Sequence, residues 1–134
     1  MATSTRPRRS RRTIALEKLI QAALEDMKAL DVRVLDVRGL TDIADTMIIA
    51  SGTSDRHVRS IAERVIERAR AGDLKPLGVE GQREGEWVLV DFNDIIVHVM
   101  LPRVRELYGL ERLWEAPQAL AAVASRRPRR RLRE

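Results

Sequence analysis

The sequence predicts an α+β fold in which helices pack on a five-stranded mixed sheet, with the elements in the order αββαβββα. Two apolar runs, Trp87–Val90 and Ile95–Met100, are rich in β-branched residues and flank a segment of turn-forming Asp and Asn, which predicts a β-hairpin. Neither run alternates with polar residues, so both strands are expected to be covered on both faces. Two other segments repeat apolar residues at helical spacing, and one of them provides the only obvious parallel crossover.

The first part of the chain predicts one helix and two strands. Thr13 has a side chain suited to cap the helix. The apolar residues that recur there at helical spacing are Leu16, Leu19, Ile20, Ala23, Leu24, Met27 and Leu30. Strands are expected at Val32–Val37 and Thr46–Ala50, and Gly39 marks the turn after the first of them.

The middle of the chain predicts a second helix and a third strand before the hairpin. Thr53 or Ser54 caps this helix, and Gly72 lies where its C-terminal cap is expected. The apolar stripe of the helix is Val58, Ile61, Ala62, Val65, Ile66 and Ala69. A short strand is expected at Leu77–Glu80, and a last helix follows the hairpin over about Arg103–Leu110.

Composition indicates a single domain without disulfides. A chain of 134 residues is long enough for a hydrophobic core, and the lack of cysteine excludes disulfides and thiol chemistry. No apolar run approaches the roughly 18 residues of a membrane-spanning helix, and the basic N-terminus lacks the apolar stretch of a secretory signal. We therefore expect a cytoplasmic protein with no membrane contact, and nothing in the sequence indicates a cofactor.

The net charge of +5 is the sum of two basic terminal arms and an acidic central part of the chain. Residues 1–13 and 125–134 each have a net charge of +5 from arginine, which leaves −5 for the residues between them. We expect a disordered basic arm at 1–12, a single domain at 13–116 and a partly disordered basic arm at 117–134, because such arms bury no apolar surface. The arms either contact RNA phosphates or are solvated tails without a specific role. The arginines predicted to contact RNA are Arg8, Arg9, Arg127, Arg129 and Arg130.

Three features could indicate catalysis or metal binding, and each has a simpler explanation. Ser51–Ser54 is a Gly-containing turn between a strand and a helix, as in nucleotidyltransferases, but no close pair of carboxylates follows it to hold divalent metal ions. Asp91 and Asp94 are explained by a hairpin turn. His57 and His98 lack the spacing of metal ligands, so structural roles are expected for both. We therefore predict no catalytic residue and no metal site.

Two of the four aromatic residues are candidates for a binding surface. Trp87 lies at a strand end directly after the polar segment Gly81–Glu86, where complete burial is difficult. Tyr108 borders the apolar face of the last predicted helix. Trp and Tyr beside Arg are typical of protein interfaces, although packing at the edge of the core would also explain both residues.

Five segments occur in an order and spacing that are specific in combination: Asp45–Ala50, Gly52–Val58, Pro76–Gly81, Trp87–Met100 and Arg105–Trp114. Together they resemble the ribosomal silencing factor S family, also called Iojap. The resemblance runs from about Ile14 to Glu115, and the basic arms lie outside the family pattern.

The resemblance implies a nucleotidyltransferase-like fold without demonstrated catalysis. It also implies binding to the large ribosomal subunit through its ribosomal protein number fourteen, which blocks joining of the small subunit and lowers translation when nutrients run short. Transferred by position, the contact surface consists of Trp87, Met100, Tyr108, Leu110 and Glu111. Because family members can pair in isolation, we also expect a weak homodimer of the free protein.

These inferences favour a translational repressor that acts by steric block. The acidic central part of the chain suits a basic ribosomal protein, since complementary charges help two proteins to dock. Two alternatives stay open at this point. One is a nucleotidyltransferase-like enzyme that binds nucleotide and metal, and the other is an RNA-binding module that acts through the basic arms.

Overall fold

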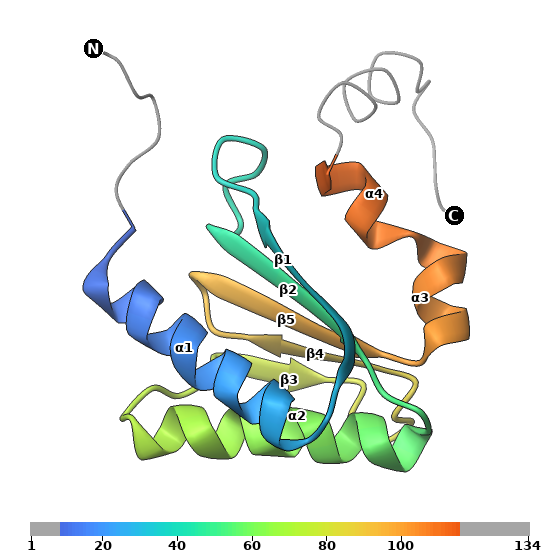
Figure 1. The fold of residues 1–134 in the computed structure, drawn as a ribbon. Helices are drawn as coiled ribbons and strands as arrows, with labels where there is room; N and C mark the ends of the chain where they lie inside the picture. Colours follow the sequence, from blue (N-terminus) through green and yellow to red (C-terminus); the bar gives the residue numbers. More distant parts are fainter. Residues whose placement is uncertain (1–8, 116–134) are drawn as a thin grey trace, which may run out of the picture.

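The computed structural model describes residues 9–115 of the protein, which form helices packed on one sheet (Figure 1). The elements, in chain order, are α1 (Arg11–Asp26), β1 (Leu30–Asp36), β2 (Thr46–Ser51), α2 (Asp55–Ala71), β3 (Gly78–Glu80), β4 (Trp87–Asp91), β5 (Ile95–Met100), α3 (Pro102–Tyr108) and α4 (Leu110–Glu115). Within this described part, no helix combines the length and the apolar character that a membrane crossing requires.

The five strands form one mixed sheet in the order β1-β2-β5-β4-β3, which confirms the predicted fold class. The pairs β1–β2, β3–β4 and β4–β5 are antiparallel, whereas β2 and β5 are parallel, and the chain between them contains α2, β3 and β4. β4 and β5 form the predicted hairpin, with Trp87 opposite Met100 and Asp91 opposite Ile96. The likeness to nucleotidyltransferases stays a prediction.

The two strands of the hairpin differ in how well they are covered. Every residue of the central strand β5 is buried, as expected. In β4, Val88 and Val90 are buried, but Trp87, Leu89 and Asp91 on the opposite face are only half-buried. The expectation of full coverage is therefore wrong for β4, because the helices on that face cover only part of the sheet.

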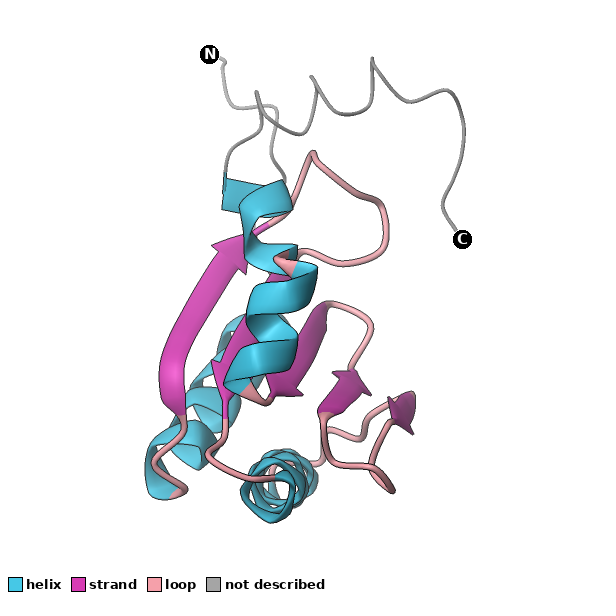
Figure 2. Ribbon diagram, turned by 90° about the vertical axis from the view of Figure 1, so that its right-hand side faces the viewer, coloured by secondary structure: helices cyan, strands magenta, loops and turns pink. Residues whose placement is uncertain are grey.

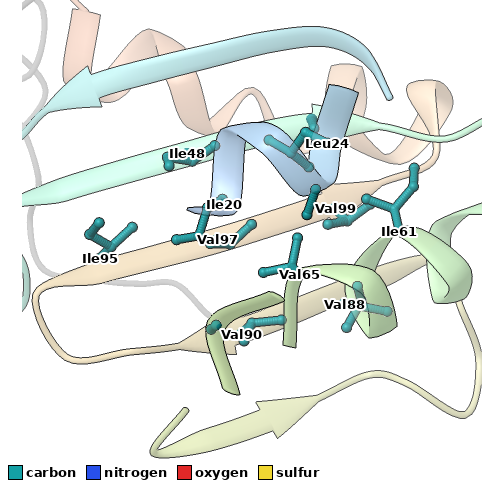
Figure 3. Close-up of a cluster of buried hydrophobic side chains, with 14 of the residues drawn as sticks. Ile20, Leu24, Ile48, Ile61, Val65, Val88, Val90, Ile95, Val97 and Val99 are labelled. Atoms are coloured by element: carbon teal, nitrogen blue, oxygen red, sulfur yellow. The ribbon is translucent and has the colours of Figure 1, made fainter. Parts of the chain in front are cut away.

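α1 and α2 cover one face of the sheet and build the main hydrophobic core with it. The buried side chains labelled in Figure 3 come from these two helices and from β2, β4 and β5: Ile20, Leu24, Ile48, Ile61, Val65, Val88, Val90, Ile95, Val97 and Val99. The strand residues are mostly β-branched, which suits a pleated surface. The buried positions of both helical stripes face this core, as their spacing predicted. Leu30, the last residue of the predicted first stripe, instead begins β1 and is 42% exposed.

A smaller core lies on the opposite face of the sheet, beneath α3 and α4. It consists of the buried residues Leu35, Val37, Met47, Ile49, Met100 and Val104. Trp87, Leu101 and Leu110 are partly buried and pack against it. Figure 1 shows α3 and α4 on the right of the molecule, and Figure 2, seen from that side, shows α2 end-on below the strands. This second core therefore supports most of the predicted contact residues.

The start of α1 differs from the prediction. The N-cap is Ser10, whose side chain accepts a hydrogen bond from the backbone N–H of Thr13 at 3.0 Å. Thr13 is instead buried inside the helix, and its hydroxyl donates to Asp94 Oδ2 at 3.1 Å. Arg11 and Arg12 belong to α1, so the folded domain begins earlier than the predicted boundary at residue 13.

One more helix follows the last predicted one. α3 ends at Tyr108, and Gly109 takes the left-handed conformation with a φ of 57°. Its backbone N–H donates to the carbonyl of Arg105 at 2.9 Å, which closes the helix, and α4 then starts at Leu110. The helix predicted over about Arg103–Leu110 is therefore present as α3 with a slightly earlier end, and the order of elements gains one further helix, α4, which was not predicted.

Candidate protein-binding surface

The end of the hairpin brings two aromatic rings together on the second face of the sheet. Trp87 begins β4 and lies opposite Met100, the last residue of β5. After Leu101 the chain turns directly into α3, because Pro102 fits the first turn of a helix. Tyr108 at the end of α3 lies against Trp87, with the ring centroids 4.9 Å apart and the planes inclined by 51°.

This contact leaves apolar surface open to solvent. The tilted arrangement is one that aromatic pairs prefer. Tyr108 is 57% exposed and its neighbour Leu107 is 76% exposed, whereas Trp87 is half-buried against the second core. We call Trp87 and Tyr108 the aromatic surface, and Leu107 directly precedes Tyr108 in α3. Clustered apolar side chains at the surface are typical of a protein-binding site.

His98 fixes the position of the Trp87 indole. The indole Nε1–H donates to His98 Nδ1 at 2.9 Å, and the two ring centroids are 5.8 Å apart. His98 is only 5% exposed, and this burial lowers the pKa of His98 to about 4. The imidazole is therefore neutral at pH 7 and has its proton on Nε2, since Nδ1 is the acceptor. His98 thus has a structural role and orients the aromatic surface.

Acid is expected to destabilise the domain through His98. Its folded-state pKa of about 4 lies below the ordinary value of 6.5, so the unfolded chain binds more protons than the folded chain between these values. The free energy of unfolding should have its full value above about pH 6.5 and decrease toward pH 4, by on the order of 3 kcal/mol. Urea unfolding across this range would show a shallower pH dependence for His98→Gln than for the unmodified protein. His57→Gln is the matched control, and an unchanged pH dependence in His98→Gln would contradict the assignment.

The five residues transferred from the family resemblance do not all lie at the surface. Trp87 and Tyr108 are in contact, and Leu110 and Glu111 follow them at the start of α4, where both are half-buried. Met100 is fully buried in the second core, so its predicted direct contact with a partner is corrected. The reason is that α3 folds over the end of β5 and covers this side chain.

Arg105 connects α3, α4 and the sheet. Its Nε and Nη2 donate to the two carboxylate oxygens of Glu111 at 2.7 and 3.0 Å, and its Nη1 donates to Ser51 Oγ at 2.9 Å. The hydrogen bond from Arg105 lowers the pKa of Glu111. Arg33 of β1 makes a longer ion pair with the same carboxylate at 3.7 Å. These contacts hold Glu111 in one position across the bend at Gly109.

Sequence reasoning missed Leu107 and Arg105. Leu107 is the most exposed large apolar side chain among residues 9–112, whose burial the structure describes, and an apolar residue beside Tyr108 in a helix rich in charge was the available signal. Arg105 offered no such signal, because a buried arginine cannot be distinguished from a surface arginine by its sequence neighbours. Its role depends on Ser51 and Glu111, which lie on other elements.

The candidate catalytic residues serve the local structure. Asp91 Oδ1 accepts a hydrogen bond from the backbone of Asn93 at 2.8 Å, and Asp94 accepts one from Thr13. Ser54 caps α2 by accepting from the backbone of His57 at 3.1 Å. Across residues 9–115 no group of three or more His, Cys, Asp or Glu side chains is arranged to hold a metal ion.

The other histidine and the basic arms complete the predicted residues. His57 Nδ1 accepts from the backbone N–H of Thr53 at 2.9 Å, and its Nε2 donates to the carbonyl of Met27 at 2.8 Å, so this ring joins α2 to the end of α1. Arg9 forms an ion pair with Glu17 of α1. The other arginines predicted to contact RNA lie outside the described residues: Arg8, Arg127, Arg129 and Arg130.

A small α+β domain with an exposed aromatic surface is typical of a protein that acts by binding another macromolecule. The family model described as "Ribosomal silencing factor during starvation" matches residues 10–133, and the chain belongs to this family. The resemblance seen in the sequence is thereby confirmed. The match extends to residue 133, so the C-terminal arm lies within the family's length, contrary to the expectation that both arms lie outside it.

Individual relatives agree with the family match. The chain is 42% identical over 113 residues to the ribosomal silencing factor RsfS of Chromobacterium violaceum, which covers 84% of this chain and 93% of that protein. A crystal structure of a protein from Chromobacterium violaceum matches with a TM-score of 0.75 and 43% identity, over 77% of this chain and 86% of that one. A more distant relative, the mouse mitochondrial assembly of ribosomal large subunit protein 1, is 30% identical over 72% of this chain and 43% of its own length.

The family defines the general role of this protein. Its members are named for silencing the ribosome during starvation, so the protein acts in the regulation of translation and has the ribosome as its partner. Ribosomal silencing factors are regulatory proteins rather than enzymes.

Proposed function

We propose that this protein binds the large ribosomal subunit and sterically blocks its joining to the small subunit, which lowers translation under nutrient limitation. The observation that best supports the proposal is the contact between Trp87 and Tyr108, which leaves a partly exposed aromatic surface. The name of the mouse relative refers to the large ribosomal subunit, which favours this subunit as the binding partner. In this proposal the protein acts in the cytoplasm without catalytic turnover.

The contact within the large subunit that we propose is ribosomal protein number fourteen. Trp87, Leu107 and Tyr108 would form the apolar centre of the interface, with Leu110 and Glu111 beside them. Met100 would support Trp87 from the core without touching the partner. The residues between the two basic arms have a net charge of −5, which complements a basic ribosomal protein.

Co-sedimentation tests the proposal. The full-length protein is expected to sediment with isolated large subunits and to be absent from small subunits and from intact ribosomes, because the joined small subunit would occupy the blocked surface. Equal association with small subunits would contradict the proposed partner.

The basic arms are expected to strengthen attraction to ribosomal RNA without choosing the partner. Electrostatic attraction to phosphate weakens by roughly 0.9 log units per log unit of salt for each phosphate neutralised on a duplex. Removal of residues 1–8 and 126–134 leaves the Ser10 cap of α1 intact and should flatten the salt dependence of binding to large subunits. Titrations at several salt concentrations measure this slope, with the full-length protein as reference. Identical slopes would show that the arms do not contribute.

A weak homodimer of the free protein is a further part of the proposal. Exposed apolar surface is unfavourable in water, so two copies would cover part of the aromatic surface and compete with ribosome binding. Analytical ultracentrifugation should show weaker self-association for Tyr108→Ala, and an unchanged dimer would exclude Tyr108 from the dimer contact.

A further inference from the structure

A hollow of ≈ 240 Å³ lies beside Trp87 where the second face of the sheet is not covered by helices. Glu80, Gly81, Trp87 and Leu89 line it. Glu80 of β3 lies opposite Leu89 of β4, and Leu89 lies opposite His98 of β5, so these side chains share one face of the sheet. The hollow therefore adjoins the aromatic surface.

The backbone gives the hollow a fixed wall. Gly81 has a φ of +84°, and a Cβ atom at this position would lie 2.0 Å from the carbonyl oxygen of Trp87. A larger residue would force the chain away from β4, both by this clash and by its unfavourable φ. The close approach of Gly81 keeps the segment after β3 next to Trp87.

The lining of the hollow combines apolar surface with one negative charge. Trp87 and Leu89 are half-buried and present the indole ring and an aliphatic side chain. Glu80 is exposed, and no ion pair within residues 9–115 includes it. An aromatic face beside a carboxylate is suited to a cation on a long aliphatic chain, because the chain packs on apolar surface while the charge contacts both the ring and the acid.

We propose that this hollow binds an arginine or lysine side chain of the docking partner. The aliphatic part lies on Leu89 and Trp87, and the charged group pairs with Glu80 beside the indole. This inference rests on the proposed function for the identity of the partner, but the chemistry of the hollow can be tested without a ribosome. Glu80 is then a specificity-determining residue that selects a basic side chain.

The first test uses small probes and the full-length protein. N-acetyl-arginine amide and N-acetyl-lysine amide are added while the indole N–H resonances of Trp87 and Trp114 are followed by NMR. Both cationic probes are expected to shift the Trp87 resonance in a saturable way, and the neutral isostere N-acetyl-citrulline amide is not. Glu80→Gln should abolish the shift, whereas Glu25→Gln on α1 should retain it. No shift with either cation, or an equal shift with citrulline, would overturn the proposal.

The second test uses large ribosomal subunits. Glu80→Gln is expected to weaken their binding by about fivefold at low salt, since one partly exposed ion pair is lost. Binding that is normal in the unmodified protein and unchanged in Glu80→Gln would overturn the site and leave the proposed function intact. A saturable shift with the cationic probes in a protein that does not bind large subunits would support the site and reject the proposed function.

Discussion

Replacement of Trp87 by alanine is expected to weaken binding to large ribosomal subunits by roughly thirtyfold or more, because aromatic anchors at interfaces typically contribute about 2 kcal/mol or more. The change removes the ring that contacts Tyr108 and the N–H group that His98 orients. Tyr108→Ala removes the more exposed partner of the pair and is expected to weaken binding as well. Equilibrium titration with purified large subunits measures both effects, and thermal unfolding shows whether each variant is folded.

Two further variants separate the contributions. Trp87→Phe retains an aromatic ring but lacks the indole N–H, so its affinity should lie between those of the unmodified protein and Trp87→Ala. Ile43→Ala is the matched control, because Ile43 is 69% exposed in the loop between β1 and β2. This loop leads into β2 beside Ile95, at the other end of β5 from Met100 and Trp87. Normal affinity of a folded Trp87→Ala variant would reject the aromatic surface. Loss of the fold would instead assign Trp87 to the core.

Replacement of Arg105 by alanine is expected to lower the free energy of unfolding by on the order of 3 kcal/mol. The substitution leaves the carboxylate of Glu111 and the hydroxyl of Ser51 without their donor at a site where the Arg105 side chain is only 9% exposed. It also removes the connection that holds α4 across the bend at Gly109. Urea unfolding measures the change. Arg105→Lys should restore only part of the stability, because lysine cannot make the bidentate contact with the carboxylate of Glu111.

Arg103→Ala provides the comparison for Arg105. Arg103 pairs with Glu86 at 3.4 Å, but its side chain is 71% exposed. Such surface pairs contribute little, so the stability of Arg103→Ala should change by less than about 1 kcal/mol. Equal destabilisation by Arg103→Ala and Arg105→Ala would contradict the role assigned to the buried arginine.

Local patterns in the sequence were sufficient for most of the fold. The hairpin, the short strand before it and the stripe of α2 were predicted because their signals lie within one segment each. β1 was predicted at Val32–Val37 but runs over Leu30–Asp36, and its register shifts between Leu30 and Arg33, where Asp31 has a φ of 49°. A register shift of this kind breaks the alternation of inward and outward side chains from which strand boundaries are predicted. The cap at Ser10 was missed because Thr13, three residues later, has an equally suitable side chain.

The candidate site depended more on contacts between distant segments. The family resemblance pointed to Trp87 and Tyr108, and the structure places these two rings in contact. Their exposure depends on how α3 packs over β5, which no local pattern records, and the same packing buries Met100. The bend at Gly109 likewise decides the position of Glu111. Sequence spacing alone could not show either effect.

Subunit joining is the most direct measure of the central claim. Purified large subunits are first incubated with the protein, small subunits are then added, and light scattering follows the formation of joined ribosomes. The unmodified protein is expected to reduce joining in proportion to the large subunits it occupies, and folded Trp87→Ala is expected to reduce it only at much higher concentration. Undiminished joining by large subunits saturated with the protein would contradict the steric block.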